Sequence, residues 1–300
     1  MKSNHFEVII IGGSYAGLSA GMALGRSLRN VLIIDGGMPC NRQTPHSHNF
    51  LTHDGKPPKE ISDLARSQVE AYPTIKFLND EVRSAKKSSG NFEVETKTSG
   101  KFFADKLILA SGVKDIMPDI PGFSECWGIS VLHCPYCHGY EVRNEVTGIL
   151  ANGDMGFEIS KLVFNLTKDL TLFTNGESAL NKEQSEKLFQ KNIHIVEDEI
   201  ERIEHKNGQI QKLIFKNGKE IPLKALYAKV HLEQNINIED LGCELTEHGH
   251  IKIDGMHSTT IPGVFACGDN TTMMRSVANA VAQGNFTGAI VNKELVEEKF

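Results

Sequence analysis

The fold is decided by Val8-Ile9-Ile10-Ile11-Gly12-Gly13-Ser14-Tyr15-Ala16-Gly17. An apolar, β-branched run ends there at two glycines, and the small residues Ala16 to Gly21 follow. This pattern predicts a buried strand, a tight turn and a helix that packs closely on the strand. A second apolar run, Val31 to Ile34, ends at Asp35. The chain therefore opens with a strand–helix–strand unit of a parallel sheet.

The glycine turn has most of a dinucleotide-binding fingerprint. Such a turn needs glycine at the bend, where the backbone approaches the pyrophosphate, and where the helix meets the strand. Gly12 and Gly17 take the first and third positions, and Ser14 takes the second. Asp35 is spaced to accept hydrogen bonds from a ribose, and its charge would repel a 2′-phosphate. The sequence thus favours the adenosine diphosphate of FAD or NAD, and an ordinary glycine-rich loop is the structural alternative.

Composition describes an ordinary folded chain with enough length for two domains. The 300 residues are 40% hydrophobic and 23% charged, with 32 basic and 38 acidic side chains for a net charge of −6. That balance excludes a broad basic surface, so nucleic acid is not an expected partner. No window approaches the roughly 20 apolar residues of a membrane span, and the N-terminus lacks a secretory pattern, which predicts a cytoplasmic protein.

A second strand–turn–helix–strand pattern weakly repeats the first. Val146 to Leu150 leads through Ala151-Asn152-Gly153-Asp154-Met155-Gly156 into a predicted helix, and an apolar run over 170–173 follows. The expected fold class is α/β, with two doubly wound, Rossmann-like dinucleotide-binding domains. The second domain is inserted into the first. We expect the first domain to comprise 1–115 and 242–300, and the second to comprise 116–241.

The most informative stretch is Cys134-Pro135-Tyr136-Cys137-His138-Gly139-Tyr140-Glu141. Two residues between cysteines allow a reversible disulfide, and proline favours a helix start that lowers a thiol pKa. His138 could stabilise a thiolate as imidazolium or relay its proton. Three alternatives compete with this redox interpretation: a zinc site, which lacks a second ligand pair, a c-type haem attachment, and two inert buried cysteines. We expect no metal, and we expect the other four cysteines to be small buried side chains.

One more stretch, Thr260 to Asp269, places an acidic side chain after a strand and Gly268. The chain resembles the flavoprotein disulfide reductases with two dinucleotide domains, and among them the low-molecular-weight thioredoxin reductase-like branch. The resemblance covers nearly the whole chain, with the motifs in the same order. The resemblance implies FAD and a homodimer, with Asp269 holding the ribityl chain. It also implies that the segment beginning Arg275-Ser276-Val277 lies under the flavin ring. A close-packed helix is the alternative for that segment.

The same resemblance implies roles for the cysteines. Cys137 would meet the flavin, and Cys134 would exchange with the substrate. His138 stands where thioredoxin reductases have aspartate, so the motif is more similar to dithiol oxidases of the gliotoxin and holomycin type. Thioredoxin reductases grip the NADPH 2′-phosphate with arginines after a strand of the second domain, where this chain has Thr174-Asn175-Gly176-Glu177. NADPH or NADH therefore lacks its usual anchor.

Three functional hypotheses follow. The first is a thioredoxin reductase-like enzyme that moves electrons between flavin and a disulfide, with a thioredoxin-like protein or a small dithiol or disulfide as partner. The second is a dithiol oxidase that uses oxygen and needs no NADPH. The third is a flavin-binding redox sensor that does not turn over. The direction of electron flow and the physiological thiol are open at this point.

Overall fold

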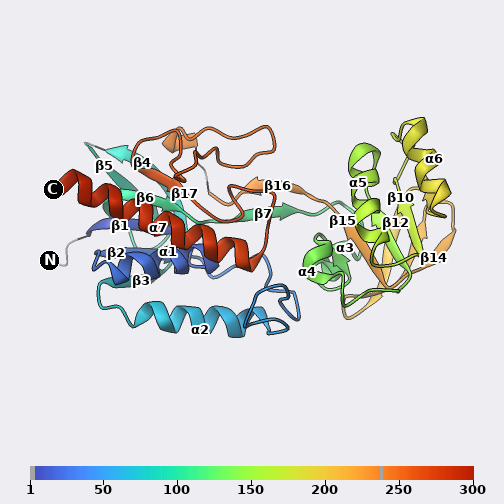
Figure 1. Cartoon of the computed structure of the whole chain (residues 1–300), viewed down its shortest axis with the longest axis horizontal. Coiled ribbons are helices and arrows are strands. Elements are labelled where there is room, and N and C mark those ends of the chain that lie inside the picture. The colour runs from blue at the N-terminus through green and yellow to red at the C-terminus, as the bar shows by residue number, and fades with distance from the viewer. Residues whose placement is uncertain (1–3, 89, 237–238) are drawn as a thin grey trace. The chain divides into compact units, whose positions relative to one another are not determined.

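The computed structural model describes residues 4–88, 90–236 and 239–300. The chain forms two compact units. Unit 1 comprises Met1–Arg42, Asn49–Lys114 and Leu232–Phe300, and unit 2 comprises Gln43–His48 and Asp115–His231. Both units combine a parallel sheet with helices (Figure 1), which confirms the expected α/β class with one dinucleotide-type domain inserted into the other. Among the described residues, no helix has the length and apolar character needed to cross a bilayer.

Unit 1 is built on a seven-stranded sheet of order β3-β2-β1-β6-β5-β4, with β17 also paired to β6. Strands β3, β2, β1, β6 and β17 are parallel, whereas β5 and β4 form an antiparallel extension. The strands are β1 (His5–Ile11), β2 (Val31–Asp35), β3 (Ile75–Asn79), β4 (Val82–Ser88), β5 (Asn91–Thr96), β6 (Lys101–Leu109) and β17 (Val264–Ala266). The helices are α1 (Tyr15–Arg26), α2 (Pro58–Glu70), the 3₁₀ turn η1 (Glu239–Leu241) and α7 (Val277–Lys299).

The parallel strands are apolar on both faces because both faces are covered. In β1, Val8 and Ile10 join the core under α1 and α7, whereas Ile9 and Ile11 join the core on the opposite face. This alternation follows from the two-residue period of a strand. The continuous Val-Ile-Ile-Ile run is thus a signature of burial on both sides.

Helices α1 and α7 run side by side in unit 1 (Figure 1). Two glycines of α7 permit the approach: a Cβ on Gly284 would lie 2.8 Å from the carbonyl carbon of Ala16, and a Cβ on Gly288 would lie 2.7 Å from the carbonyl oxygen of Ala20. Because backbone atoms cannot swing aside, any larger residue would push the helices apart. The small-residue helix expected after the first turn is therefore matched by a second one near the C-terminus.

Unit 2 has a five-stranded parallel sheet of order β11-β10-β9-β15-β8 and an antiparallel three-stranded sheet of order β12-β13-β14. Asn207 and Gly208 join β12 to β13 with positive φ at both positions, as a two-residue hairpin requires. The strands are β8 (Val131–Leu132), β9 (Thr147–Leu150), β10 (Leu170–Phe173), β11 (His194–Val196), β12 (Ile200–Lys206), β13 (Gln209–Phe215), β14 (Glu220–Pro222) and β15 (Ala225–Ala228). The helices are α3 (Phe123–Cys126), α4 (Pro135–His138), α5 (Gly153–Phe164) and α6 (Lys182–Gln190).

The two chain connections pair with each other as β7 (Val113–Ile116) and β16 (His231–Gln234). The second connection returns to unit 1 at Leu232, earlier than residue 242, where the sequence analysis placed it. Side chains explain the earlier return, because Gln234 donates to the Gly249 carbonyl at 2.7 Å and Asn235 to the Ser111 carbonyl at 2.7 Å. The segment Gln43–His48 also belongs to unit 2, although its neighbours in sequence belong to unit 1.

Candidate functional site: a dinucleotide cradle and a redox disulfide

The first glycine turn is a cradle that only glycine permits. Gly12 has φ +107°, and a Cβ there would lie 2.6 Å from the carbonyl carbon of Ala110. A Cβ on Gly17 would lie 3.0 Å from the carbonyl carbon of Gly12, where α1 meets β1. Ser14 is the N-cap residue of α1 and makes no side-chain capping bond. The backbone N–H groups at this helix start are therefore suited to a pyrophosphate.

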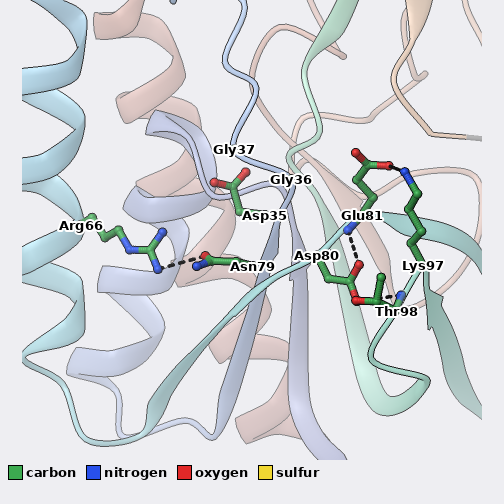
Figure 2. A pocket seen from close by; sticks show the side chains of 9 residues that line it. All are labelled: Asp35, Gly36, Gly37, Arg66, Asn79, Asp80, Glu81, Lys97 and Thr98. Carbon is green, nitrogen blue, oxygen red and sulfur yellow. Dashed lines mark hydrogen bonds and ion pairs between the residues drawn. The ribbon is translucent and has the colours of Figure 1, made fainter.

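Asp35 ends β2 beside that turn. Its Oδ1 accepts a hydrogen bond from the Gly13 backbone N–H at 3.2 Å. A pocket of about 470 Å³ lies next to it. Its lining residues, drawn in Figure 2, are Asp35, Gly36, Gly37, Arg66, Asn79, Asp80, Glu81, Lys97 and Thr98. The Asp35 carboxylate lies in the wall of this pocket, at the end of β2. Gly13, which lies within the turn, thus contacts Asp35 directly.

The far wall of this pocket depends on Asp80, a residue that the sequence analysis missed. Its carboxylate accepts hydrogen bonds from the Thr98 N–H and hydroxyl and from the Ser99 N–H, at 3.1, 2.9 and 2.8 Å. Burial alone would raise the pKa of Asp80, but these hydrogen bonds hold it well below its usual range. Asp80 therefore fixes the loop after β5 against the end of β3. The only sequence signal was an Asn-Asp pair after a short apolar run.

Gly268 and Asp269 follow β17 and lie near the same turn. A Cβ on Gly268 would lie 2.9 Å from the Ala16 Cβ, and the Gly268 N–H donates to Gln283 Oε1 at 2.7 Å. The Asp269 carboxylate accepts from Arg275 Nε at 3.2 Å, with both side chains largely buried. The structure thus assembles these predicted residues in unit 1.

The start of α7 lies next to this ion pair in sequence. Ser276 is the N-cap residue of α7 and accepts from the Asn279 N–H at 3.1 Å, and Val277 is the first helical residue. Cys126, Cys243 and Cys267 are buried as expected. The expectation was wrong for Cys40, which is exposed, because it lies in a loop over Asp269, with Sγ 3.8 Å from Oδ2.

The redox motif lies in unit 2. Cys134 and Cys137 form a disulfide with their Cα atoms 5.4 Å apart. Cys134 is the N-cap residue of α4, its Sγ accepts from the Cys137 N–H at 3.2 Å, and Pro135 follows at the first helical position. Gly139 allows the turn to lie against the sheet, because a Cβ there would lie 3.2 Å from the Tyr227 hydroxyl of β15. The local sequence therefore closes the small ring that a reversible disulfide needs.

His138 is half-buried directly after the second cysteine. Burial lowers its pKa, the charge of His48 lowers it further, and the charge of Glu141 raises it in part. The imidazole is thus neutral near pH 7 in the disulfide form. Of the two roles considered for this residue, proton acceptance from a thiol needs the neutral ring.

The second glycine turn differs from the first in what occupies it. Asn152 is the N-cap residue of α5, and its Oδ1 accepts from the Gly153 and Ala179 N–H groups, both at 2.8 Å. Its Nδ2 donates to the Glu177 carbonyl at 2.8 Å. Asp154 lies in the first turn of α5 and accepts from Gln184 Nε2 at 2.6 Å. No lysine or arginine occurs from 169 to 181.

The residues of unit 1 fit FAD. The cradle that only glycine permits leaves the helix-start N–H groups facing a space suited to a pyrophosphate, and the pocket beside Asp35 adjoins it. Among the described residues, no group of three or more His, Cys, Asp or Glu side chains is arranged to hold a metal ion.

Comparisons with known proteins agree with this architecture. A thioredoxin reductase of Claviceps purpurea is 32% identical over 311 residues, covering 99% of this chain and 96% of that protein. A thioredoxin reductase of Aspergillus oryzae is 30% identical over 320 residues, covering 100% of this chain and 99% of that protein. The crystal structure of an oxidoreductase from Agrobacterium tumefaciens superposes with a TM-score of 0.92 and 39% identity, covering 98% of this chain and 99% of that one.

The sequence signature of the pyridine nucleotide-disulphide oxidoreductases matches residues 6–284. Two dinucleotide-type units, a glycine cradle and a Cys-x-x-Cys disulfide are what such enzymes use to pass electrons between FAD and a disulfide. The chain therefore belongs to the pyridine nucleotide-disulphide oxidoreductase family, as a thioredoxin reductase-like, FAD-dependent disulfide oxidoreductase.

Proposed function

We propose that the chain is a dithiol oxidase. It takes two electrons and two protons from a small dithiol through Cys134 and Cys137, and oxygen is the final electron acceptor. The net reaction converts a dithiol and O₂ into a disulfide and H₂O₂. The proposal specifies the direction of an FAD-dependent disulfide oxidoreductase and dispenses with NADPH and NADH.

The observation that carries this proposal is the occupied second glycine turn. A pyrophosphate at such a turn accepts hydrogen bonds from the N–H groups at the helix start. Here the Asn152 side chain already accepts from the Gly153 and Ala179 N–H groups. A nucleotide would have to displace that amide and leave its oxygen in need of new donors, which costs free energy. Unit 2 therefore lacks the ready anion site that unit 1 has.

The charges around the second turn point the same way. Asp154 lies in the first turn of α5, and Glu177 and Glu197 lie beyond the ends of β10 and β11. Glu197 Oε1 accepts from the Ser178 N–H at 3.0 Å, which keeps this carboxylate at the loop where thioredoxin reductases have arginines. Carboxylates repel a 2′-phosphate or a pyrophosphate, and no guanidinium compensates for them. NADPH therefore has no partner of opposite charge in this loop.

The proposed chemistry begins with a substrate thiol, whose sulfur loses its proton as it attacks Sγ of Cys134. The new substrate–Cys134 bond forms as the Cys134–Cys137 bond breaks, and Cys137 Sγ receives the electron pair. His138 accepts the proton of the attacking thiol. The second substrate thiol then attacks the substrate sulfur of the mixed disulfide, which releases the product disulfide and returns the electron pair and a proton to Cys134.

The residues around the dinucleotide cradle would hold FAD. Gly12, Gly13, Ser14, Ala16 and Gly17 would surround the pyrophosphate. The remaining contacts would come from Asp35, Gly268, Asp269, Arg275, Ser276 and Val277, of which Asp35 takes the adenosine ribose and Asp269 the ribityl chain. FAD, when bound, supplies a two-electron acceptor for the cysteine pair and reacts with oxygen. A homodimer stays a prediction from the resemblance.

Anaerobic bleaching of the protein's visible absorbance tests the proposal. The purified holoprotein is mixed separately with NADPH, NADH, reduced thioredoxin and dithiothreitol, and oxygen is then admitted. We expect dithiothreitol to bleach the absorbance, oxygen to restore it, and H₂O₂ to form in equal amount. Bleaching by NADPH or NADH as fast as by dithiothreitol would overturn the oxidase proposal in favour of a reductase.

Two variants separate turnover from simple cofactor binding. Cys137→Ser should retain FAD and lose dithiol-dependent turnover. Cys243→Ser is the matched control, because this cysteine is buried in unit 1, with its Sγ 3.6 Å from the Thr259 hydroxyl, and is not part of the redox motif. Equal turnover in both variants would contradict the role of the disulfide. No turnover with any donor in the unmodified protein would favour the redox sensor.

A further inference from the structure

A carboxylate and an imidazole from separate segments of unit 2 meet beside the redox motif. Glu141 follows the motif, and its Oε1 lies 3.5 Å from Nδ1 of His48. His48 belongs to Gln43–His48, the short segment that is part of unit 2 although its sequence neighbours are in unit 1. The His48 side chain is 19% exposed and that of Glu141 37%, so solvent only partly screens the pair.

The charges of both members of this pair act on His138. The charge of His48 opposes a positive charge on His138, whereas the charge of Glu141 supports it, and both effects act on top of burial, which lowers the pKa of His138. Two further titratable groups border the pair: His46, whose ring centroid lies 6.4 Å from that of His48, and Tyr227 of β15, on which the charge of Glu141 acts. The two charges that bear on His138 thus have opposite signs and come from different segments.

The inner side of this cluster is buried. The Tyr227 side chain is 1% exposed, and its hydroxyl has no hydrogen-bond partner within the described part of the chain. Burial and the charge of Glu141 both raise the pKa of Tyr227, so the field of this carboxylate reaches the interior beneath Gly139. In such a buried region a single charge acts more strongly on its neighbours than it would in water.

We propose that Glu141 is a positioning residue for thiol–disulfide exchange at Cys134–Cys137. It holds His48 beside the motif, and its negative charge stabilises the imidazolium that forms when His138 takes the proton of the attacking thiol. Glu141 does not itself receive the proton. The charge of His48 opposes the imidazolium and so favours release of the proton from His138. The inference rests on the proposed function, because it uses His138 as the proton acceptor.

This arrangement follows a general pattern of activated nucleophiles. A base next to a thiol works best when a third group orients it and stabilises its charged form. Glu141 and His138 are three residues apart, so both can lie on the same side of the turn that follows the disulfide. A carboxylate that only held the loop in place would affect the rate of thiol–disulfide exchange without affecting the charge state of His138. The sign of the pH effect therefore separates the two roles.

The test measures reduction of the Cys134–Cys137 disulfide by dithiothreitol in the anaerobic holoprotein. Samples are quenched with an alkylating reagent between pH 4.5 and 8, and the labelled cysteines are counted by mass spectrometry. This readout follows the exchange step itself and needs neither oxygen nor NADPH. The variants are Glu141→Gln, Glu141→Asp and His48→Gln. Glu247→Gln is the matched control, because it breaks a similar carboxylate–histidine pair, 3.4 Å from His248, on the surface of unit 1.

We expect Glu141→Gln to slow exchange at pH 7 about tenfold or more, which is less than the roughly 10²- to 10⁴-fold contribution of a general base itself. Its acid limb should move to lower pH, because the support for a positive charge on His138 is gone. His48→Gln should move the acid limb to higher pH. Glu141→Asp should recover most of the rate, and Glu247→Gln should behave like the unmodified protein.

Two results would overturn the inference. One is slower exchange in Glu141→Gln and His48→Gln with the acid limb of the pH profile unmoved. That result would mean that the pair only holds the local structure. The other is a shift of both variants in the same direction. If Glu141→Gln does not fold, His48→Gln and Glu141→Asp carry the same test. Failure of the proposed function is distinguishable from failure of this inference. An acid limb that persists in His138→Gln would show that His138 is not the proton acceptor. A lack of oxygen consumption would contradict the oxidase proposal and leave the pH profile of the exchange step unchanged.

Discussion

The close packing of α1 on α7 supports a quantitative prediction for Gly284→Ala. The added Cβ would lie 2.8 Å from the carbonyl carbon of Ala16 and 3.0 Å from its Cα, whereas ordinary contacts begin near 3.4 Å. Both obstacles are backbone atoms, so the helices must separate by several tenths of an ångström. Overpacking of this kind costs about 1–3 kcal/mol. In a domain of this size the melting temperature should fall by about 2–12 °C.

The same displacement should weaken FAD binding, because Ala16 belongs to the dinucleotide turn. The assay is the ratio of visible to ultraviolet absorbance before and after desalting, together with a thermal melt of the holoprotein. Gly255→Ala is the matched control: this glycine is also in unit 1, its φ is outside the left-handed region, and a Cβ there would meet nothing within 4 Å. We expect the control to change stability by less than about 0.5 kcal/mol.

Equal melting temperature and equal FAD retention in Gly284→Ala and Gly255→Ala would refute the reasoning. It would mean that the two helices can separate without cost and that the turn does not depend on their distance. A lower melting temperature with unchanged FAD retention would refute only the link between α7 and the cofactor.

Three further predictions concern charge. Burial alone would raise the pKa of Glu7, but hydrogen bonds from Lys299, the Asn30 backbone and Arg29, with the charge of Lys299, hold it at about 2 instead of 4.5. This depressed pKa contributes stability that is present above pH 4.5 and lost as the pH falls toward 2, so Glu7→Gln should lower the free energy of unfolding by about 2 kcal/mol at pH 7. The difference from the unmodified protein should disappear in urea melts near pH 2, and a difference that persists there would exclude this origin. Because the pKa of His138 is lowered, the acid limb of disulfide reduction should lie below pH 6.5, and a limb above 6.5 would contradict neutral His138. Asp35→Asn should weaken FAD binding, measured by cofactor release on dilution, about tenfold, and unchanged release would show that Asp35 does not contact the ribose.

The sequence predicted the elements whose signals are local. The run Val8 to Ile11 could be identified as a buried strand because β-branched apolar residues without alternation fit a strand covered on both faces. The turn at Gly12 and the disulfide ring at Cys134 and Cys137 could also be identified, since spacing along the chain determines both. Each of these depends on contacts between residues that are close in sequence.

Other parts of the candidate site could not be predicted, because distant segments form them. The pocket beside Asp35 is completed by Asp80, which is fixed by the loop at Thr98. The pair of Glu141 and His48 joins two residues that have 92 others between them in the sequence. Neither pairing leaves a mark in local composition or periodicity.

The amino-acid sequence by itself determined the fold class, the dinucleotide turn and the redox disulfide, because short-range sterics and the period of apolar residues set these features. Only the tertiary structure decided which charges surround His138 and what occupies the second glycine turn. The Asn152 side-chain oxygen accepts from the Gly153 and Ala179 N–H groups, and Ala179 is far from it in sequence. Electrostatic and hydrogen-bond environments depend on distances between segments, and those distances exist only after the chain has folded.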